Sequence, residues 1–166
     1  MSIDYHTICR ALYQEARFLD DRQWDEWLAC YTEDVTWWMP AWDDDDRLTD
    51  DPHSQISLMY YPDRGGLEDR VFRIKTERSG ASMPEPRTSH NVTNVEVLAE
   101  REGQHGSEID VRYNFNTLNH RYKVTDQFFG TIFVTFRNVD DRLLIARKKI
   151  ALKNDYIRQV LDVYHV

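Results

Sequence analysis

The chain has 166 residues and a formal net charge of −8, with 41% hydrophobic and 13% aromatic residues. This acidic balance argues against a nucleic-acid partner, because phosphate binding needs clustered Lys and Arg, and here the basic runs are short. The length and apolar content exclude disorder and predict one domain over residues 1–166 with a core of its own.

No apolar run reaches the ~18 residues that a membrane-spanning helix needs, and the N-terminus lacks the pattern of a signal peptide. The two cysteines, Cys9 and Cys30, follow no disulfide or metal-binding pattern and lie in helical stretches. They are typical of reduced thiols near a core. We therefore expect a cytoplasmic protein with no membrane segment.

Two helices are predicted at the start of the chain. Residues 4–19 carry apolar side chains at the spacing of one buried helical stripe, and Asp4 is a suitable N-cap. The pattern breaks at Asp20-Asp21 and resumes over residues 24–31, with either aspartate as the expected cap of the second helix. A tight turn between them predicts two antiparallel helices.

The next segment, residues 34–39, alternates as a strand and is stopped by Pro40. Adjacent strand residues face opposite ways, so one ring of the Trp37-Trp38 pair points into the core and the other away from it. The outward ring has two interpretations. It is either a partly exposed Trp covered by the following loop or an anchor for a partner, since Trp is favoured at interface hot spots.

Residues 42–55 predict an acidic loop, and residues 56–61 a short extended or helical piece. The spacing of apolar residues over 67–74 predicts a further helix, with Glu68 and Asp69 in its first turn. Residues 79–86, which contain Gly and Pro, predict a loop.

The second half is strand-like. Residues 92–97, 109–117, 128–136 and 143–152 show period-two alternation, and residues 138–142 connect the last two as a hairpin. Residues 156–163 are either a short helix or an extended tail. Helices followed by a long meander predict an α+β fold, with the N-terminal helices packed on one face of a curved antiparallel sheet.

Several segments, in order and at similar spacing, resemble the small (β) subunits of aromatic-ring-hydroxylating dioxygenases. The resemblance is strongest to the benzoate and toluate 1,2-dioxygenase branch, with anthranilate and halobenzoate enzymes near it. The segments that carry it are Asp20 to Trp27, Cys30-Tyr31-x-x-Asp34, Trp42 to Asp46, Tyr60 to Arg64, Leu67 to Val71, Arg87 to Asn91 and Lys153 to Ile157.

The resemblance implies a cone-shaped fold like that of nuclear transport factor 2. It also implies a hexamer of three α and three β subunits, in which the β chains associate as a trimer. In the family the α chain carries a Rieske [2Fe–2S] cluster and a mononuclear non-haem iron, and a separate NADH-dependent reductase supplies electrons to it. This chain is then a structural subunit of an enzyme that converts a benzoate-type acid into a cis-diol.

The residues agree with that division of labour. A Rieske cluster needs paired Cys and His ligands, and a mononuclear iron site needs two His and a carboxylate on one face. Among the two Cys and six His, only His6 and Cys9 lie within ten positions of each other. The sequence therefore predicts no catalytic, cofactor-binding or metal-binding residue in this chain.

Six residues are candidates for a partner interface, because aromatic side chains and Arg are enriched in interfaces. For the arginines, the alternative is a solvated helix face on which they pair with Glu68, Asp69 and Glu77. The six candidates are Trp38, Trp42, Tyr60, Tyr61, Arg64 and Arg70.

Two further hypotheses compete with this one. The run Asp43 to Asp46 is a weak candidate for a divalent cation, since it lacks the spacing and the Gly of a calcium loop; a solvated loop or a subunit contact is the alternative. Asp34, Tyr60, His90 and Tyr113 could line the cavity of a free-standing cone-fold isomerase or dehydratase, or of a small-ligand binding module.

Overall fold

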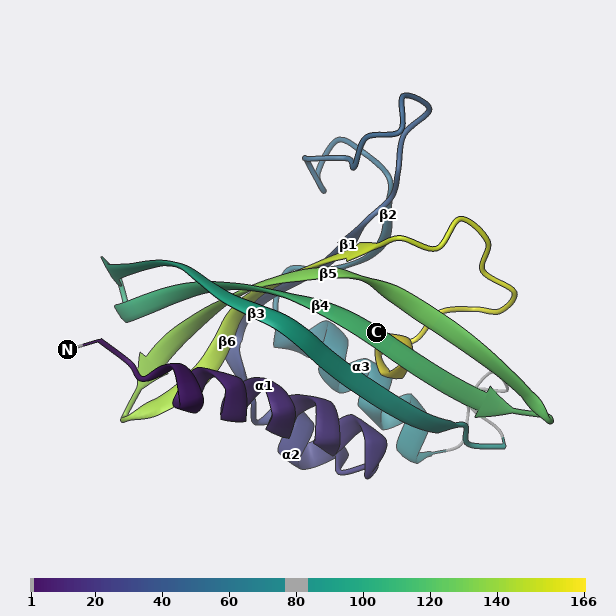
Figure 1. The fold of residues 1–166 in the computed structure, drawn as a ribbon, viewed down its shortest axis with the longest axis horizontal. Coiled ribbons are helices and arrows are strands. Elements are labelled where there is room, and N and C mark those ends of the chain that lie inside the picture. Colours follow the sequence, from purple (N-terminus) through teal and green to yellow (C-terminus); the bar gives the residue numbers. More distant parts are fainter. Residues whose placement is uncertain (1, 77–83) are drawn as a thin grey trace.

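The computed structural model describes residues 2–76 and 84–166. Within them, six strands form one sheet in the order β2-β1-β6-β5-β4-β3, and three α-helices lie against one of its faces (Figure 1). The helices are α1 (Tyr5–Asp20), α2 (Trp24–Leu28) and α3 (Arg64–Lys75), and a 3-10 turn, η2 (Val163–His165), ends the chain. The strands are β1 (Tyr31–Pro40), β2 (Ser57–Tyr61), β3 (Arg87–Gly103), β4 (Gly106–Arg121), β5 (Val124–Val139) and β6 (Arg142–Leu152).

Helix α1 forms as predicted. The Asp4 carboxylate accepts hydrogen bonds from the backbone N–H groups of His6 and Thr7 and thereby caps the start of the helix. The helix buries one apolar stripe against the sheet, and its contacts are chiefly with β3.

Helix α2 is shorter than predicted. It ends at Leu28, and Tyr31 instead opens β1, where it pairs with Ile145 of β6. Neither predicted aspartate caps α2; Gln23 is the N-cap, and within the described part of the chain its side chain makes no capping hydrogen bond. Sheet pairing of Tyr31 thus overrides the helical spacing, and Cys30, predicted to be helical, lies half-buried between α2 and β1.

Helix α3 begins earlier than predicted, at Arg64, where the Asp63 side chain accepts from the Gly65 N–H. Glu68 and Asp69 therefore lie beyond the first turn. Residues 57–61 form a strand and not a helix. Of the predicted loop at 79–86, residues 79–83 lie outside the described part of the chain.

The sheet is mixed, which corrects the prediction of a purely antiparallel one. Strand β1 runs parallel to β6, while the other neighbouring pairs are antiparallel. The predicted β5–β6 hairpin is confirmed, with Asp140 and Asp141 both at positive φ (50° and 61°), as a two-residue turn requires. Residues 153–162 form neither the predicted helix nor an extended strand; they are irregular, with bends at Asp155 and Gln159, and lead to the buried turn η2.

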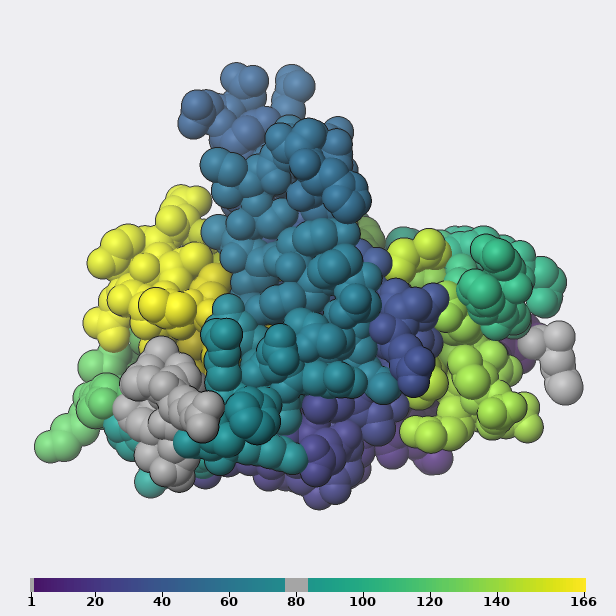
Figure 2. All heavy atoms as spheres, turned by 180° about the vertical axis from the view of Figure 1, so that it is seen from behind, coloured from purple at the N-terminus to yellow at the C-terminus, as the bar shows by residue number. Residues whose placement is uncertain are grey.

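Residues 41–56, which we call the arm, project from the body between β1 and β2 (Figures 1 and 2). The sheet otherwise curves around a core built from its inner face and the helices. This is the predicted cone-shaped α+β fold. In the described residues, no helix is both long enough and apolar enough to cross a membrane.

Candidate partner interface

The face of the sheet opposite the helices, the outer face, carries an aromatic side chain one strand in from its β2 edge. Trp38 of β1 lies opposite Tyr60 of β2 on one side and Lys149 of β6 on the other. Its indole Nε1 donates to the Ser57 hydroxyl at 2.8 Å, and the Lys149 ammonium lies 5.0 Å from its ring centroid. The ring is therefore held in place while remaining partly exposed.

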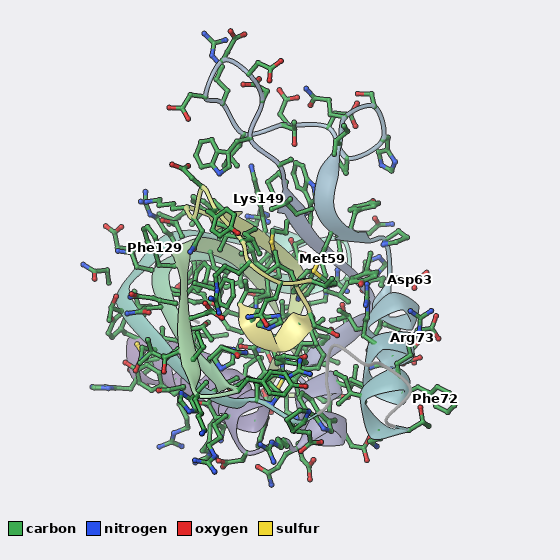
Figure 3. All side chains as sticks on the ribbon, turned by 90° about the vertical axis from the view of Figure 1, so that its right-hand side faces the viewer. Met59, Asp63, Phe72, Arg73, Phe129 and Lys149 are labelled. Atoms are coloured by element: carbon green, nitrogen blue, oxygen red, sulfur yellow. The ribbon has the colours of Figure 1, made fainter. Side chains whose placement is uncertain are left out.

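Trp38 lines a groove of about 420 Å³ on this face, which we call the outer-face groove. Its floor is apolar, and its charged members come from β4 and β6. Figure 3 shows Lys149 near the foot of the arm. The residues that line the groove include Thr36, Trp38, Leu98, Asp110, Phe133, Arg147 and Lys149.

The rim of the groove is held by a network of ion pairs. Asp110 pairs with Arg101 and accepts from the Thr135 hydroxyl at 2.6 Å. Burial alone raises the pKa of Asp110, but these two hydrogen bonds and the Arg charge outweigh it and hold the pKa below its ordinary value. The groove thus presents a fixed carboxylate on one side and the Lys149 ammonium on the other.

Two more predicted residues lie at the arm: Trp42 belongs to it, and Tyr60 of β2 contacts it. Trp42 is 42% exposed, and its Nε1 donates to the Leu152 carbonyl at 2.7 Å, which ties the arm to the end of β6. Tyr60 packs edge-on against His53, with ring centroids 5.7 Å apart. Ile56, 79% exposed, adds an apolar side chain to the same region. Trp38, Trp42 and Tyr60 therefore lie on connected parts of one surface.

The other three candidates lie around α3. The Tyr61 hydroxyl accepts from the Arg70 Nε at 2.7 Å, and its ring lies 5.9 Å from that of Trp37. Arg64 pairs with Glu68 at 2.9 Å and donates to the Tyr31 carbonyl, so the predicted helix-face pairing is confirmed for this arginine. Asp69, the second predicted partner, is exposed and forms no ion pair with a described residue, and Glu77, the third, lies outside the described residues.

The six candidates thus fall on two surfaces. Tyr60 and Tyr61 are neighbours on one strand and must face opposite sides of the sheet, and the two arginines lie on the same side as Tyr61.

The first residue of the Asp43 to Asp46 run has a structural role, since the Asp43 carboxylate accepts hydrogen bonds from the N–H groups of Asp45 and Arg47. Among residues 2–76 and 84–166, no three His, Cys, Asp or Glu side chains are placed to hold a metal ion.

The hypothetical catalytic set does not come together. Asp34 is exposed and pairs with Arg137 at 2.9 Å, and Tyr60 lies on the outer face. His90 is bonded to Asp20 near the end of α1, and Tyr113 is buried on the inner face, 2% exposed. Asp34 and Tyr60 therefore lie on the outer face, whereas His90 and Tyr113 lie on the inner face.

Sequence reasoning missed a buried ion pair on the inner face. Glu15 of α1 and Lys148 of β6, 4% and 2% exposed, meet at 2.9 Å, and Glu15 also accepts from Trp27 and the Tyr31 hydroxyl. Burial raises the pKa of Glu15, but Lys148 and the three hydrogen bonds outweigh it, so the pKa is below its ordinary value. One feature of the sequence could have indicated this pair: Glu15 interrupts the apolar stripe of α1, and Lys148 lies at an inward position of β6.

Known proteins match this chain over most or all of its length. Residues 14–159 match the model of the family described as ring hydroxylating beta subunit. The chain is 57% identical over 166 residues to the toluate 1,2-dioxygenase subunit beta of Pseudomonas putida, with 100% of both covered. It is 53% identical to the benzoate 1,2-dioxygenase subunit beta of Acinetobacter baylyi, covering 99% of this chain and 95% of that one.

A solved structure agrees with these sequence relatives. The beta subunit of the benzoate 1,2-dioxygenase from Burkholderia mallei superimposes with a TM-score of 0.82 at 46% identity, covering 100% of this chain and 99% of that one. The full-length match, the fold and the sequence segments agree. The chain belongs to the ring-hydroxylating dioxygenase beta-subunit family.

Proposed function

We propose that this chain is the structural subunit of an oxygenase that dihydroxylates a benzoate-type aromatic acid. The observation that carries the proposal is full-length identity of 53–57% to relatives named as beta subunits of benzoate and toluate 1,2-dioxygenases. The overall reaction consumes O₂ and NADH-derived electrons and yields a cis-diol carboxylate. The chemistry takes place in the α subunit, and this chain supplies no ligand to either iron centre.

The proposed partners follow from the family. Three α and three β subunits assemble in the cytoplasm, with the Rieske cluster and the mononuclear iron in the α chains, and the reductase acts on the α chains. The β chain holds the α subunits in their threefold arrangement, so that an electron passes from the Rieske centre of one α subunit to the iron of its neighbour. Loss of assembly therefore costs activity although β has no catalytic residue.

The outer-face groove and the arm are the proposed contact surface for the assembly. A partly exposed Trp38 over an apolar floor, with Asp110 and Lys149 fixed on opposite sides, offers both an anchor and charge complementarity. The α3 surface is the second candidate; there the polar groups of Tyr61, Arg64 and Arg70 bond within the chain.

Co-expression with the α-type chain tests the proposal. We expect a complex of hexameric mass by light scattering, iron in the complex but none in β purified alone, and benzoate turnover by the complex only. Iron in the lone chain, or turnover without α, would contradict the structural-subunit role. A full-size complex that turns over another aromatic acid in place of benzoate would contradict the substrate assignment alone.

A further inference from the structure

A second polar cluster lies inside the cone, away from the outer-face groove. Asp20, the last residue of α1, accepts from the His90 Nδ1 at 2.6 Å, from the His90 backbone N–H and from the Thr88 hydroxyl at 2.9 Å. The carboxylate thereby holds one imidazole against the start of β3. The His90 side chain is only 7% exposed.

Four buried polar atoms next to this dyad have no hydrogen-bond partner among the described residues. They are His90 Nε2, Thr117 Oγ1, and both the Nδ2 and Oδ1 atoms of Asn119. Thr117 and Asn119 are 0% and 1% exposed. In proteins, buried side-chain polar atoms nearly always have a hydrogen-bond partner, and a bound water or ligand is one of the explanations for a group of atoms that have none within the chain.

The strand register places these atoms side by side. His90 lies directly opposite Thr117, and Thr88 directly opposite Asn119, in the β3–β4 ladder. Because residues two apart on a strand share a face, all four side chains project from the same inner surface. The unpartnered atoms therefore belong to one cluster and are not scattered.

The cluster is closed on its far side by the end of the chain. Phe128 of β5 lies opposite Thr117, and the His165 ring packs on Phe128 with centroids 5.1 Å apart. The Nδ1 of His165 accepts from the Asp162 N–H at 2.7 Å, which fixes this 2% exposed ring. The turn η2 thus separates the cluster from bulk solvent.

The donors and acceptors define what fits. Asp20 can only accept, so the His90 Nδ1 carries a proton; Nε2 accepts a hydrogen bond while the ring is neutral and donates one when the ring is protonated. Asn119 offers both donors and an acceptor, and Thr117 can do either. The hydroxyl and amide bring no net charge to compensate a buried ion, and the carboxylate is already satisfied, so a charged occupant is disfavoured.

We propose that this cluster, the dyad cluster, binds a small uncharged molecule that both donates and accepts hydrogen bonds. The occupant links His90 Nε2 to the Asn119 amide and the Thr117 hydroxyl. Its chemistry is met by ordered water or by a small organic alcohol, and the inference stands apart from the oxygenase assignment.

A high-resolution crystal structure of the full chain, with native mass spectrometry of the same sample, tests the occupant. Density within hydrogen-bond distance of the four atoms, with the mass of the bare chain, identifies water. Density together with an added mass that is lost on denaturation identifies an organic molecule. No density beside the cluster, with its four atoms still unpaired, would overturn the proposal.

The direction in which a substitution shifts the melting temperature gives a second readout. If Asn119 is bonded to an occupant, Asn119→Leu removes those bonds and lowers the melting temperature, by about 2–4 °C or more. If the amide is unpaired, the same change replaces it by an apolar group and raises the melting temperature. Asn116→Leu on the same strand, where Asn116 accepts from Gln127 on the other face, is the matched control and should change it little.

Thr117→Val serves as a second variant in case Asn119→Leu does not fold, because Val has nearly the same shape as Thr. We expect it to lower the melting temperature and to remove the part of the density that contacts the hydroxyl. A rise in melting temperature for Thr117→Val, with the density unchanged, would count against an occupant bonded at this position.

Discussion

The two faces of the sheet carry the same pair of residue types and use them differently. In the β1–β6 register Trp37 lies opposite Lys148, and Trp38 lies opposite Lys149. Trp37 and Lys148 face the helices, with exposures of 0% and 2%. Trp38 and Lys149 face the outer-face groove, where ring and ammonium form a cation–π contact.

The inner pair contributes to the stability of the fold, whereas the outer pair is available to a partner. A buried ammonium is tolerated only with a partner, and Lys148 has Glu15 at 2.9 Å and the Tyr31 hydroxyl at 3.4 Å. The outer ammonium keeps contact with water and needs no such network. Changes on the inner face should therefore affect folding, and changes on the outer face should affect association.

The largest expected effect is that of Lys148→Ala. It leaves the Glu15 carboxylate buried without its counter-ion, which typically costs ~3–5 kcal/mol of unfolding free energy. Urea unfolding of the lone chain, followed by circular dichroism, measures it. A loss under about 1 kcal/mol would mean that the two faces are not distinguished as described. Glu15→Gln with Lys148→Met, which removes both charges, should recover part of the loss.

Acidification should weaken the inner face next. Burial first, and then the charge of His90, lower the pKa of His165 from 6.5 to about 4. Below pH 6.5 the unfolded chain binds a proton that the folded chain refuses, so stability falls between pH 6.5 and about 4, by up to about 3 kcal/mol. The lowered pKa of Glu15 adds to the loss from about pH 4.5 downward, where the unfolded carboxylate begins to bind a proton that the folded one does not.

Urea midpoints at pH 7.0, 5.5 and 4.5 measure this slope. His165→Gln keeps a hydrogen-bond acceptor without the titration and should flatten the curve between pH 6.5 and 4. An unchanged slope in this variant would show that other groups cause the acid sensitivity.

Periodicity predicted most of the fold from the sequence. Strict alternation over residues 109–117 identified β4, and the Asp4 cap with its apolar stripe identified α1, because both signals are local. Tyr31 and the parallel β1–β6 pair were missed, since strand pairing depends on residues more than one hundred positions apart. Propensity gives way to tertiary contacts at such positions.

The candidate interface was predicted less well for the same reason. Alternation showed that Trp37 and Trp38 face opposite ways, and Trp38 is indeed the one in the groove. It could not show that Phe133 and Leu98 complete the floor, because those residues come from strands far along the chain. The Glu15–Lys148 pair was hidden likewise, since no local pattern links position 15 to position 148.

Trp38→Ala should weaken assembly more than folding. Truncating an anchor at an interface typically costs ~2 kcal/mol or more of binding free energy, about a thirtyfold weaker complex. Titration of the α-type chain with the variant, followed by light scattering, measures it. Trp37→Ala is the matched inner-face control and should lower the unfolding free energy by ~3–5 kcal/mol. Equal losses of folding stability in both variants would place Trp38 in the core.

Lys149→Ala gives the smallest expected effect and the sharpest contrast with Lys148→Ala. The change removes a cation–π contact at a partly exposed site, worth ~0.5–1 kcal/mol, and leaves no buried charge without a partner. The unfolding free energy of the lone Lys149→Ala chain should therefore lie within about 1 kcal/mol of that of the parent.

If the groove receives a partner carboxylate, assembly of Lys149→Ala should weaken more at low salt than at high salt, because screening already removes that attraction in the parent protein at high salt. Lys149→Arg keeps the charge and should restore assembly. A Lys149→Ala chain that unfolds as readily as Lys148→Ala would erase the distinction between the two faces.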